Sequence, residues 1–206
     1  MTGYRPTLVR RLSQAMASAL ARSFWRLEVK GLENVPREGP LIVASNHVSV
    51  CDGPMLTIAL GQGRCLRFLA KTELFRVPLL GWWLEEVGNI PVDRGRGDVP
   101  AMRAAVEMVR RGGCLGVFPE GTRGVGGATP GRRPGQPRAV KPGVGFLARE
   151  TGARVVPARL VNTDRFPAPH RIEVRFGEPM KFEGDAGDRS ACQDFAHALM
   201  ERINTL

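Results

Sequence analysis

Residues Leu41 to Pro54 read Leu-Ile-Val-Ala-Ser-Asn-His-Val-Ser-Val-Cys-Asp-Gly-Pro and give the clearest indication of the fold. Its first four residues form a continuous apolar run, which is typical of a buried strand. Asp52 is followed by Gly53 and Pro54, and proline is favoured in the first turn of a helix. The stretch therefore predicts a strand, then a short turn, and then a helix with Asp52 as its N-cap.

His47 and Asp52 both fall within this predicted turn. In a regular helix a step of five residues rotates the side chain by about 500°, so the two groups meet only if residues 46–51 form a turn. A histidine held by a carboxylate can act as a general base on a hydroxyl, because the carboxylate fixes the tautomer and stabilises the imidazolium. Taken alone, the pair also has a plainer interpretation, in which Asp52 caps a helix and His47 is a turn residue.

Short apolar runs alternate with segments of helical periodicity along the rest of the chain. Further strands are predicted at residues 66–70, 90–92, 115–118, 154–162 and 171–176. This alternation predicts an α/β fold, a single domain whose mixed, largely parallel sheet is flanked by helices. A length of 206 residues is enough for one such domain with its own core.

The amino-terminal segment 5–27 predicts an amphipathic helix, because apolar residues recur at steps of three and four. The stripe consists of Leu8, Leu12, Met16, Leu20, Phe24 and Leu27, with arginines around it. Two interpretations stay open. The stripe lies on an anionic membrane surface, or it packs on the core with the arginines in solvent.

The net charge of +10 favours an anionic partner, either a nucleic acid, an anionic bilayer or a phosphorylated small molecule. A single tyrosine argues against a base-stacking surface, so we expect no nucleic-acid partner. No apolar run reaches the length of about 18 residues that a spanning helix needs, and Met1–Arg10 does not resemble a secretory signal. The four cysteines lack metal-type spacing and are predicted to be buried free thiols, without a metal site.

Four short segments lie at or just past the carboxyl end of a predicted strand. They are residues 46–52, 90–94, 118–123 and 155–158. Ligands of α/β sheets bind at this end of the strands, so we expect the four segments to line a single site.

In their order and spacing these segments resemble the glycerolipid acyltransferase family, in particular the lysophosphatidic acid (1-acyl-sn-glycerol-3-phosphate) acyltransferases. The matching blocks are Asn-His-(four residues)-Asp at 46–52, the Gly…Ile-Pro-Val-Asp-Arg block from Gly88 to Arg94, Phe-Pro-Glu-Gly-Thr-Arg at 118–123 and the Val-Pro segment at 155–157. The resemblance implies a glycerol-3-phosphate acyltransferase-like fold. It also implies an N-terminal amphipathic helix over 1–27, the segment open to membrane contact, and an acyltransferase domain over 28–206.

The resemblance also implies a role for each matching residue. His47 is the general base, and Asp52 orients it. The acceptor phosphate is bound by Arg94, Glu120, Gly121, Thr122 and Arg123, with support from Asn46, Lys71 and Pro157. Guanidinium groups suit this task because they bind phosphate in a bidentate fashion. One departure is Gly124, where the family often has serine, so a hydroxyl donor is missing there.

The implied reaction moves a fatty acyl group from an acyl thioester, acyl-CoA or acyl carrier protein, to the free hydroxyl of lysophosphatidic acid, giving phosphatidic acid in phospholipid biosynthesis. It needs no cofactor and no covalent enzyme intermediate, and it implies a peripheral protein at the cytoplasmic face of an anionic membrane. Two alternatives stay open. The acceptor is glycerol-3-phosphate or another lysolipid or lipid alcohol, or the chain is a non-catalytic basic module that binds membranes or nucleic acid.

Overall fold

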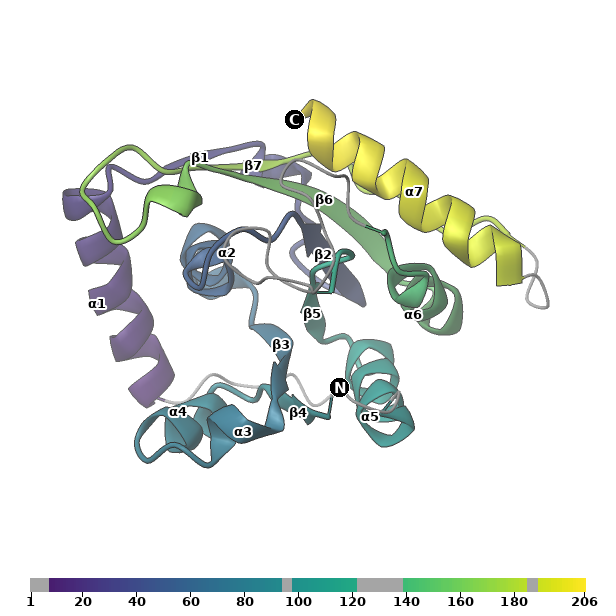
Figure 1. The fold of residues 1–206 in the computed structure, drawn as a ribbon, viewed down its shortest axis with the longest axis horizontal. Helices are drawn as coiled ribbons and strands as arrows, with labels where there is room; N and C mark the ends of the chain where they lie inside the picture. The colour runs from purple at the N-terminus through teal and green to yellow at the C-terminus, as the bar shows by residue number, and fades with distance from the viewer. Residues whose placement is uncertain (1–7, 94–97, 122–138, 185–188) are drawn as a thin grey trace, which may run out of the picture.

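The computed structural model describes residues 8–93, 98–121, 139–184 and 189–206, and within them a seven-stranded sheet forms the centre (Figure 1). The strands are β1 (Glu28–Lys30), β2 (Leu41–Ser45), β3 (Leu66–Lys71), β4 (Ile90–Val92), β5 (Cys114–Val117), β6 (Arg154–Val161) and β7 (Glu173–Phe176). Their order is β1-β7-β6-β2-β5-β3-β4. Only the β6–β7 pair is antiparallel among these strands, which confirms the predicted mixed, largely parallel sheet.

Helices cover both faces of the sheet. They are α1 (Leu8–Phe24), α2 (Asp52–Leu60), α3 (Thr72–Phe75), α4 (Leu80–Glu86), α5 (Val99–Arg110), α6 (Gly143–Thr151) and α7 (Arg189–Thr205). The helix α2 covers one face and α1 lies beside it, whereas α5, α6 and α7 lie on the other side (Figure 1). None of the described helices combines the length and the apolar character needed to cross a membrane.

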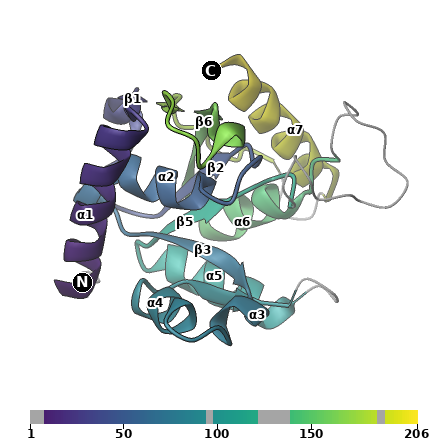
Figure 2. The same cartoon turned by 60° about the vertical axis from the view of Figure 1, so that its left-hand side comes forward.

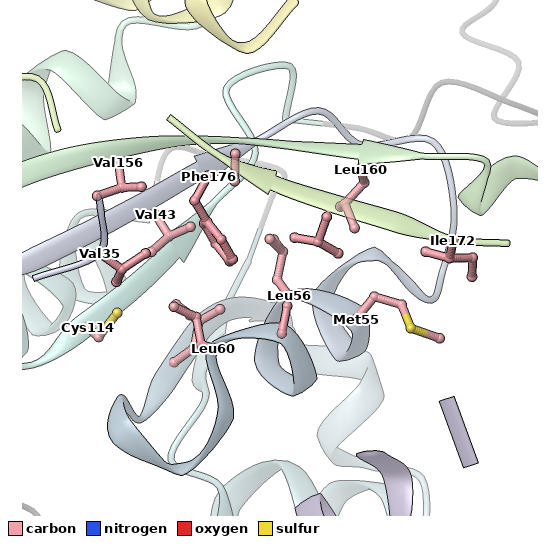
Figure 3. Packing of buried hydrophobic residues seen from close by; sticks show 14 of the residues in the cluster. Val35, Val43, Met55, Leu56, Leu60, Cys114, Val156, Leu160, Ile172 and Phe176 are labelled. Carbon is pink, nitrogen blue, oxygen red and sulfur yellow. The ribbon is translucent and has the colours of Figure 1, made fainter. Parts of the chain in front are cut away.

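The central strand β2 contributes side chains to both faces, because successive side chains of a strand point to opposite sides. Leu41 and Val43 belong to the hydrophobic cluster under α2, and Ile42 and Ala44 belong to the cluster under α5, α6 and α7. Figure 3 shows the first cluster, in which Leu56 and Leu60 of α2 face the sheet. All of β2 is therefore buried, as its continuous apolar run predicts.

The helix α1 turns its apolar stripe away from the protein. Leu8, Leu12, Met16, Leu20 and Phe24 are each 50–70% exposed, so for these five the interpretation in which the stripe packs on the core is wrong. Leu27, which follows the helix, is partly buried and does pack against the core. Contact with the domain is made instead by small and polar side chains. Ala21 is fully buried, and the amide nitrogen of Gln14 donates hydrogen bonds to the carbonyl oxygens of Thr57 (2.9 Å) and Gly61 (2.7 Å).

Candidate active site

His47 and Asp52 meet in the loop between β2 and α2. Nδ1 of His47 lies 2.8 Å from Oδ2 of Asp52, whose side chain is fully buried. An ionised carboxylate only accepts hydrogen bonds, so Nδ1 carries the proton and Nε2 is the nitrogen that can accept one. The loop thus presents an oriented imidazole, the arrangement that general-base catalysis requires.

The carboxylate of Asp52 also shapes the loop itself. Its Oδ2 accepts hydrogen bonds from the backbone amides of Val48 (2.7 Å) and Ser49 (2.8 Å). The prediction that Asp52 is the N-cap of α2 is wrong, because the N-cap is Cys51 and α2 begins with Asp52. The carboxylate faces the turn before the helix rather than the amides of the first helical turn, and this direction brings it to His47.

Cys51, next to Asp52, lies in surroundings that disfavour a reactive thiolate. Its side chain is buried, and burial raises the pKa of its thiol, which therefore stays protonated at neutral pH. Its sulfur contacts the hydroxyl oxygen of Ser49 and the carbonyl oxygen of Thr163. All four cysteines are free thiols, and the prediction that they are buried is confirmed for Cys51, Cys114 and Cys192, whereas Cys65 is only partly buried.

The segment after β5 adds two contacts to His47. The ring of Phe118 stacks on the imidazole, with 3.9 Å between the ring centroids and 13° between their planes. Oε2 of Glu120 accepts a hydrogen bond from the backbone amide of His47 at 3.2 Å. The first and third blocks of the sequence therefore form one unit around His47, and the predicted part of Glu120 in phosphate binding stays a prediction.

Gly121 ends a tight turn in which its amide donates to the carbonyl oxygen of Phe118 at 2.8 Å. It has a φ of 71°, in the left-handed region that favours glycine. A Cβ added there would lie 2.9 Å from Nζ of Lys141, so the ammonium group of that lysine lies close to this turn. The backbone amide of Lys141 also donates to the carbonyl oxygen of Pro119 at 3.0 Å.

The described parts of three of the four predicted segments lie on the same side of the sheet, at the carboxyl ends of its parallel strands. The strands β2, β5, β3 and β4 are parallel neighbours, so the loops at 46–52 and 118–121 and the ends of β3 and β4 lie on the same side. Lys71 closes β3 opposite Val92, the last residue of β4. Arg94, Thr122 and Arg123 lie outside the described residues, and their predicted phosphate contacts stay predictions.

The fourth segment lies elsewhere, which corrects the prediction that it ends a strand. Residues 155–158 are in the middle of β6, where Pro157 is buried opposite Ala44. The strand continues to Val161, and Asn46 makes its contact with Leu160 near that end. Pro157 therefore supports the sheet beneath the site rather than the site's rim.

A cavity of about 500 Å³ opens beside His47. Its walls are mostly apolar and come from α1, α2, β3, α3 and α4, with the ring of Phe118 next to the histidine. The amino-terminal end of α1 approaches α4 in both views of the fold (Figures 1 and 2). The imidazole of His47 thus lies beside a pocket whose apolar walls suit a hydrocarbon chain.

Sequence reasoning missed several residues of this site. Phe68 and Trp83 line the cavity, and Lys141 lies beside the turn at Gly121. No spacing signal marks them, because each is brought to the site by a different element of the fold. Two signals were available for Lys141: it ends the long loop that follows the 118–123 block, and the Lys141-Pro142-Gly143 turn resembles the family.

Comparison with known proteins places these features in a family. Residues 26–161 match the family described as Acyltransferase. A chloroplastic 1-acyl-sn-glycerol-3-phosphate acyltransferase of Arabidopsis thaliana is 30% identical over 165 residues, which cover 79% of this chain and 43% of that protein. The 1-acyl-sn-glycerol-3-phosphate acyltransferase of Borreliella burgdorferi is 34% identical over 163 residues, covering 76% and 61%.

Two further similarities bear on acceptor and fold. The lyso-ornithine lipid O-acyltransferase of Pseudomonas aeruginosa is 38% identical over 96 residues, covering 46% of this chain and 35% of that protein. The crystal structure of the 1-acyl-sn-glycerophosphate acyltransferase PlsC from Thermotoga maritima has the same fold. It gives a TM-score of 0.67 at 22% identity and covers 95% of this chain and 81% of that one. The chain spans less than two thirds of the length of these three curated relatives.

Proposed function

We propose that this chain, which belongs to the acyltransferase family, transfers a fatty acyl group from an acyl thioester to the free hydroxyl of lysophosphatidic acid. The observation that carries the proposal is the His47–Asp52 pair at the side of an apolar cavity. The names of the Arabidopsis and Borreliella relatives support lysophosphatidic acid as the acceptor. The acyl thioester, from coenzyme A or from acyl carrier protein, is a co-substrate, and the proposed reaction uses no further cofactor.

The proposed reaction is a direct transfer. Nε2 of His47 takes the proton of the acceptor hydroxyl while its oxygen attacks the thioester carbonyl carbon. The tetrahedral intermediate then expels the thiolate, which receives the proton from the imidazolium and leaves as a free thiol. Asp52 stabilises the transient imidazolium through Nδ1. One ester bond forms, one thioester bond breaks, and the histidine returns to its starting state.

We assign the acceptor phosphate to the loop ends beyond β4 and β5. In the described part of the chain, the turn at Gly121 with the ammonium group of Lys141 beside it supports this assignment. Lys71 adds a second cation at the end of β3. Arg94, Thr122 and Arg123 follow directly on these segments in the sequence and complete the proposed anchor.

We further propose that the protein docks on the cytoplasmic surface of an anionic membrane, where such acceptors reside. The exposed stripe of α1, defined above by Leu8, Leu12, Met16, Leu20 and Phe24, supports this, since five large apolar side chains on one helix are unfavourable in water. Exposed Arg11 and Arg22 on the same helix suit anionic headgroups. Leu79 and Trp82, 82% and 56% exposed, add apolar surface at the start of α4.

A second acceptor class has its own support. The Pseudomonas relative is named for lyso-ornithine lipid, which likewise offers a hydroxyl on a single-chain lipid. The base and the cavity suit either acceptor, and only the headgroup contacts distinguish them.

The deciding experiment measures thiol release from an acyl thioester in the presence of vesicles and one acceptor at a time. The rates of thiol release by the purified protein are compared for three acceptors: lysophosphatidic acid, glycerol-3-phosphate and lyso-ornithine lipid. We expect release with lysophosphatidic acid, and loss of that release in a folded His47→Ala variant. Unchanged thiol release in the variant would show that His47 is not the general base. A higher rate with another acceptor would show that lysophosphatidic acid is not the preferred substrate.

A further inference from the structure

Three aromatic rings form a continuous stack that ends on the proposed base. The imidazole of His47 stacks on Phe118, and Phe118 in turn stacks on Phe68, with 5.7 Å between the two phenyl centroids and 9° between their planes. Near-parallel rings at such distances attract one another beyond their buried area. The position of Phe118 against His47 is therefore coupled to the position of Phe68.

The ring of Phe68 occupies a space that a glycine provides. Phe68 in β3 is the cross-strand neighbour of Gly116 in β5. A Cβ added at Gly116 would lie 2.2 Å from Cε1 of Phe68, far inside van der Waals contact. A Cβ added at Gly53 would lie 3.6 Å from Cζ of the same ring, which is ordinary contact. The ring of Phe68 therefore occupies the space above Gly116, and it can do so only because residue 116 has no side chain.

The backbone of Phe68 is fixed as well. Its amide donates a hydrogen bond to Oδ1 of Asn89 at 2.8 Å. Phe68 is thus held at its backbone by Asn89 and at its ring by the gap over Gly116. Because both its backbone and its ring are restrained, Phe68 can in turn restrain the ring of Phe118 that stacks on it.

The hydrogen bond from His47 to Asp52 tolerates a range of angles. Small changes in χ1 and χ2 of His47 would therefore still tilt the ring and move Nε2 away from a bound hydroxyl, and a ring stacked on the imidazole restrains this tilt. We propose that Phe68 is a positioning residue for His47, which acts through Phe118, and that Gly116 makes this position available. The kinetic part of this inference rests on the proposed function, whereas the geometric part does not.

A plainer role for Phe68 is only to form part of the cavity wall, since it and Phe118 both line the cavity. The two roles predict different results. A wall residue changes which acyl chain fits and leaves the imidazole undisturbed. A positioning residue changes the surroundings of the imidazole even when no substrate is present.

Proton NMR of the histidine side chains measures those surroundings directly. Stacking on Phe118 shifts the carbon-bound protons of the His47 ring upfield through the ring current, and the spectrum is simple because the chain has three histidines. The His47 signals are assigned by their absence in His47→Gln. Phe68→Leu and Gly116→Ala are compared with Phe195→Leu, a matched control whose ring packs on Phe182 in the cluster on the other face of the sheet.

We expect the His47 signals to lose part of their upfield shift in Phe68→Leu and in Gly116→Ala, but not in Phe195→Leu. In both variants kcat should fall about tenfold to a hundredfold, with a smaller change in KM for the thioester. In the Phe68→Leu background, Gly116→Ala should have little further effect, because the clash is with the phenyl ring.

Unchanged His47 signals in both variants, or altered chain-length preference at constant kcat, would overturn the positioning role. Urea denaturation of each variant confirms that the signals come from folded protein, and the two variants disturb the ring of Phe68 by two different changes. If the signals respond as expected while the wild-type protein acylates no acceptor, the positioning role stands and the proposed function fails.

Discussion

The side-chain amide of Asn46 forms two hydrogen bonds with the backbone of Leu160, which lies 114 residues further along the chain. Its Nδ2 donates to the carbonyl oxygen at 2.9 Å, and its Oδ1 accepts from the amide at 2.8 Å. The pair ties the loop after β2 to the neighbouring strand β6. The residue directly before the proposed base is thus held by a strand that is adjacent in the sheet but far away in the sequence. The effect of this link on stability and activity can be measured.

Replacement of Asn46 by alanine should lower both stability and activity. The two backbone groups of Leu160 would lose their partners, and we expect a loss of about 1–3 kcal/mol in the free energy of unfolding. Because the loop carries His47, kcat should fall as well. Urea denaturation and thiol release measure the two effects. Asn34→Ala is the control, since Asn34 bonds one carbonyl, that of Phe176, and lies outside the cavity lining. Unchanged kcat in Asn46→Ala would contradict the link.

Replacement of Asp52 by asparagine keeps the size of the side chain but removes its charge. The imidazolium would lose its stabilising partner, and an amide nitrogen could face the amides of Val48 and Ser49, which themselves need an acceptor. We expect kcat to fall by about a hundredfold or more, measured as thiol release at saturating substrate. The exposed Asp164→Asn is a matched control with the same change of charge. Equal activities of the two variants would remove Asp52 from the mechanism.

The edge of the sheet contains a pH-dependent ion cluster. Hydrogen bonds from Arg175 and Lys30 lower the pKa of Glu173 from its ordinary 4.5 to about 2. A lowered carboxyl pKa stabilises the fold above pH 4.5, and this contribution is lost as the pH falls from 4.5 to about 2. Glu173→Gln should therefore be less stable than wild type at pH 7 and equally stable near pH 2. Urea denaturation at both pH values tests this, and a constant difference would contradict it.

The exposed stripe of α1 can be tested without disturbing the fold. Leu12→Ser with Met16→Ser removes two side chains that are more than 60% exposed, so the free energy of unfolding should change by about 1 kcal/mol or less. Co-sedimentation with phosphatidylglycerol-containing vesicles should become about tenfold weaker or more, because less apolar area is buried in the bilayer. Leu32→Ser, exposed but outside α1, is the control. Undiminished binding would point to another docking surface.

Much of this fold follows from the sequence because local signals and packing agree. The apolar run Leu41–Ala44 predicts a strand buried on both sides, and β2 is one. The turn that lets His47 meet Asp52 is also predictable, since Gly53-Pro54 marks the helix start. The sequence alone did not reveal which amides the carboxylate of Asp52 would accept from, because that depends on the path of the loop.

Other features depend on contacts between distant segments and have no local signal. The stack of His47, Phe118 and Phe68 joins three elements, and no spacing between those residues predicts it. Amphipathicity likewise could not decide which side of α1 faces the domain. In the structure the orientation of α1 is set by a polar residue, Gln14, which donates two hydrogen bonds to carbonyl oxygens of α2 and of the residue that follows it.

Those bonds of Gln14 fix the rotation of α1 about its own axis. A helix held only by apolar contacts would roll its large side chains inward in water and would have to roll back on reaching a bilayer. Here Ser13, Gln14 and Ala17 line the cavity while Leu12 and Met16 face outward, before any membrane is present. The proposed association with a lipid surface would therefore require no rearrangement of α1, and in that arrangement this one helix would separate the cavity from the bilayer.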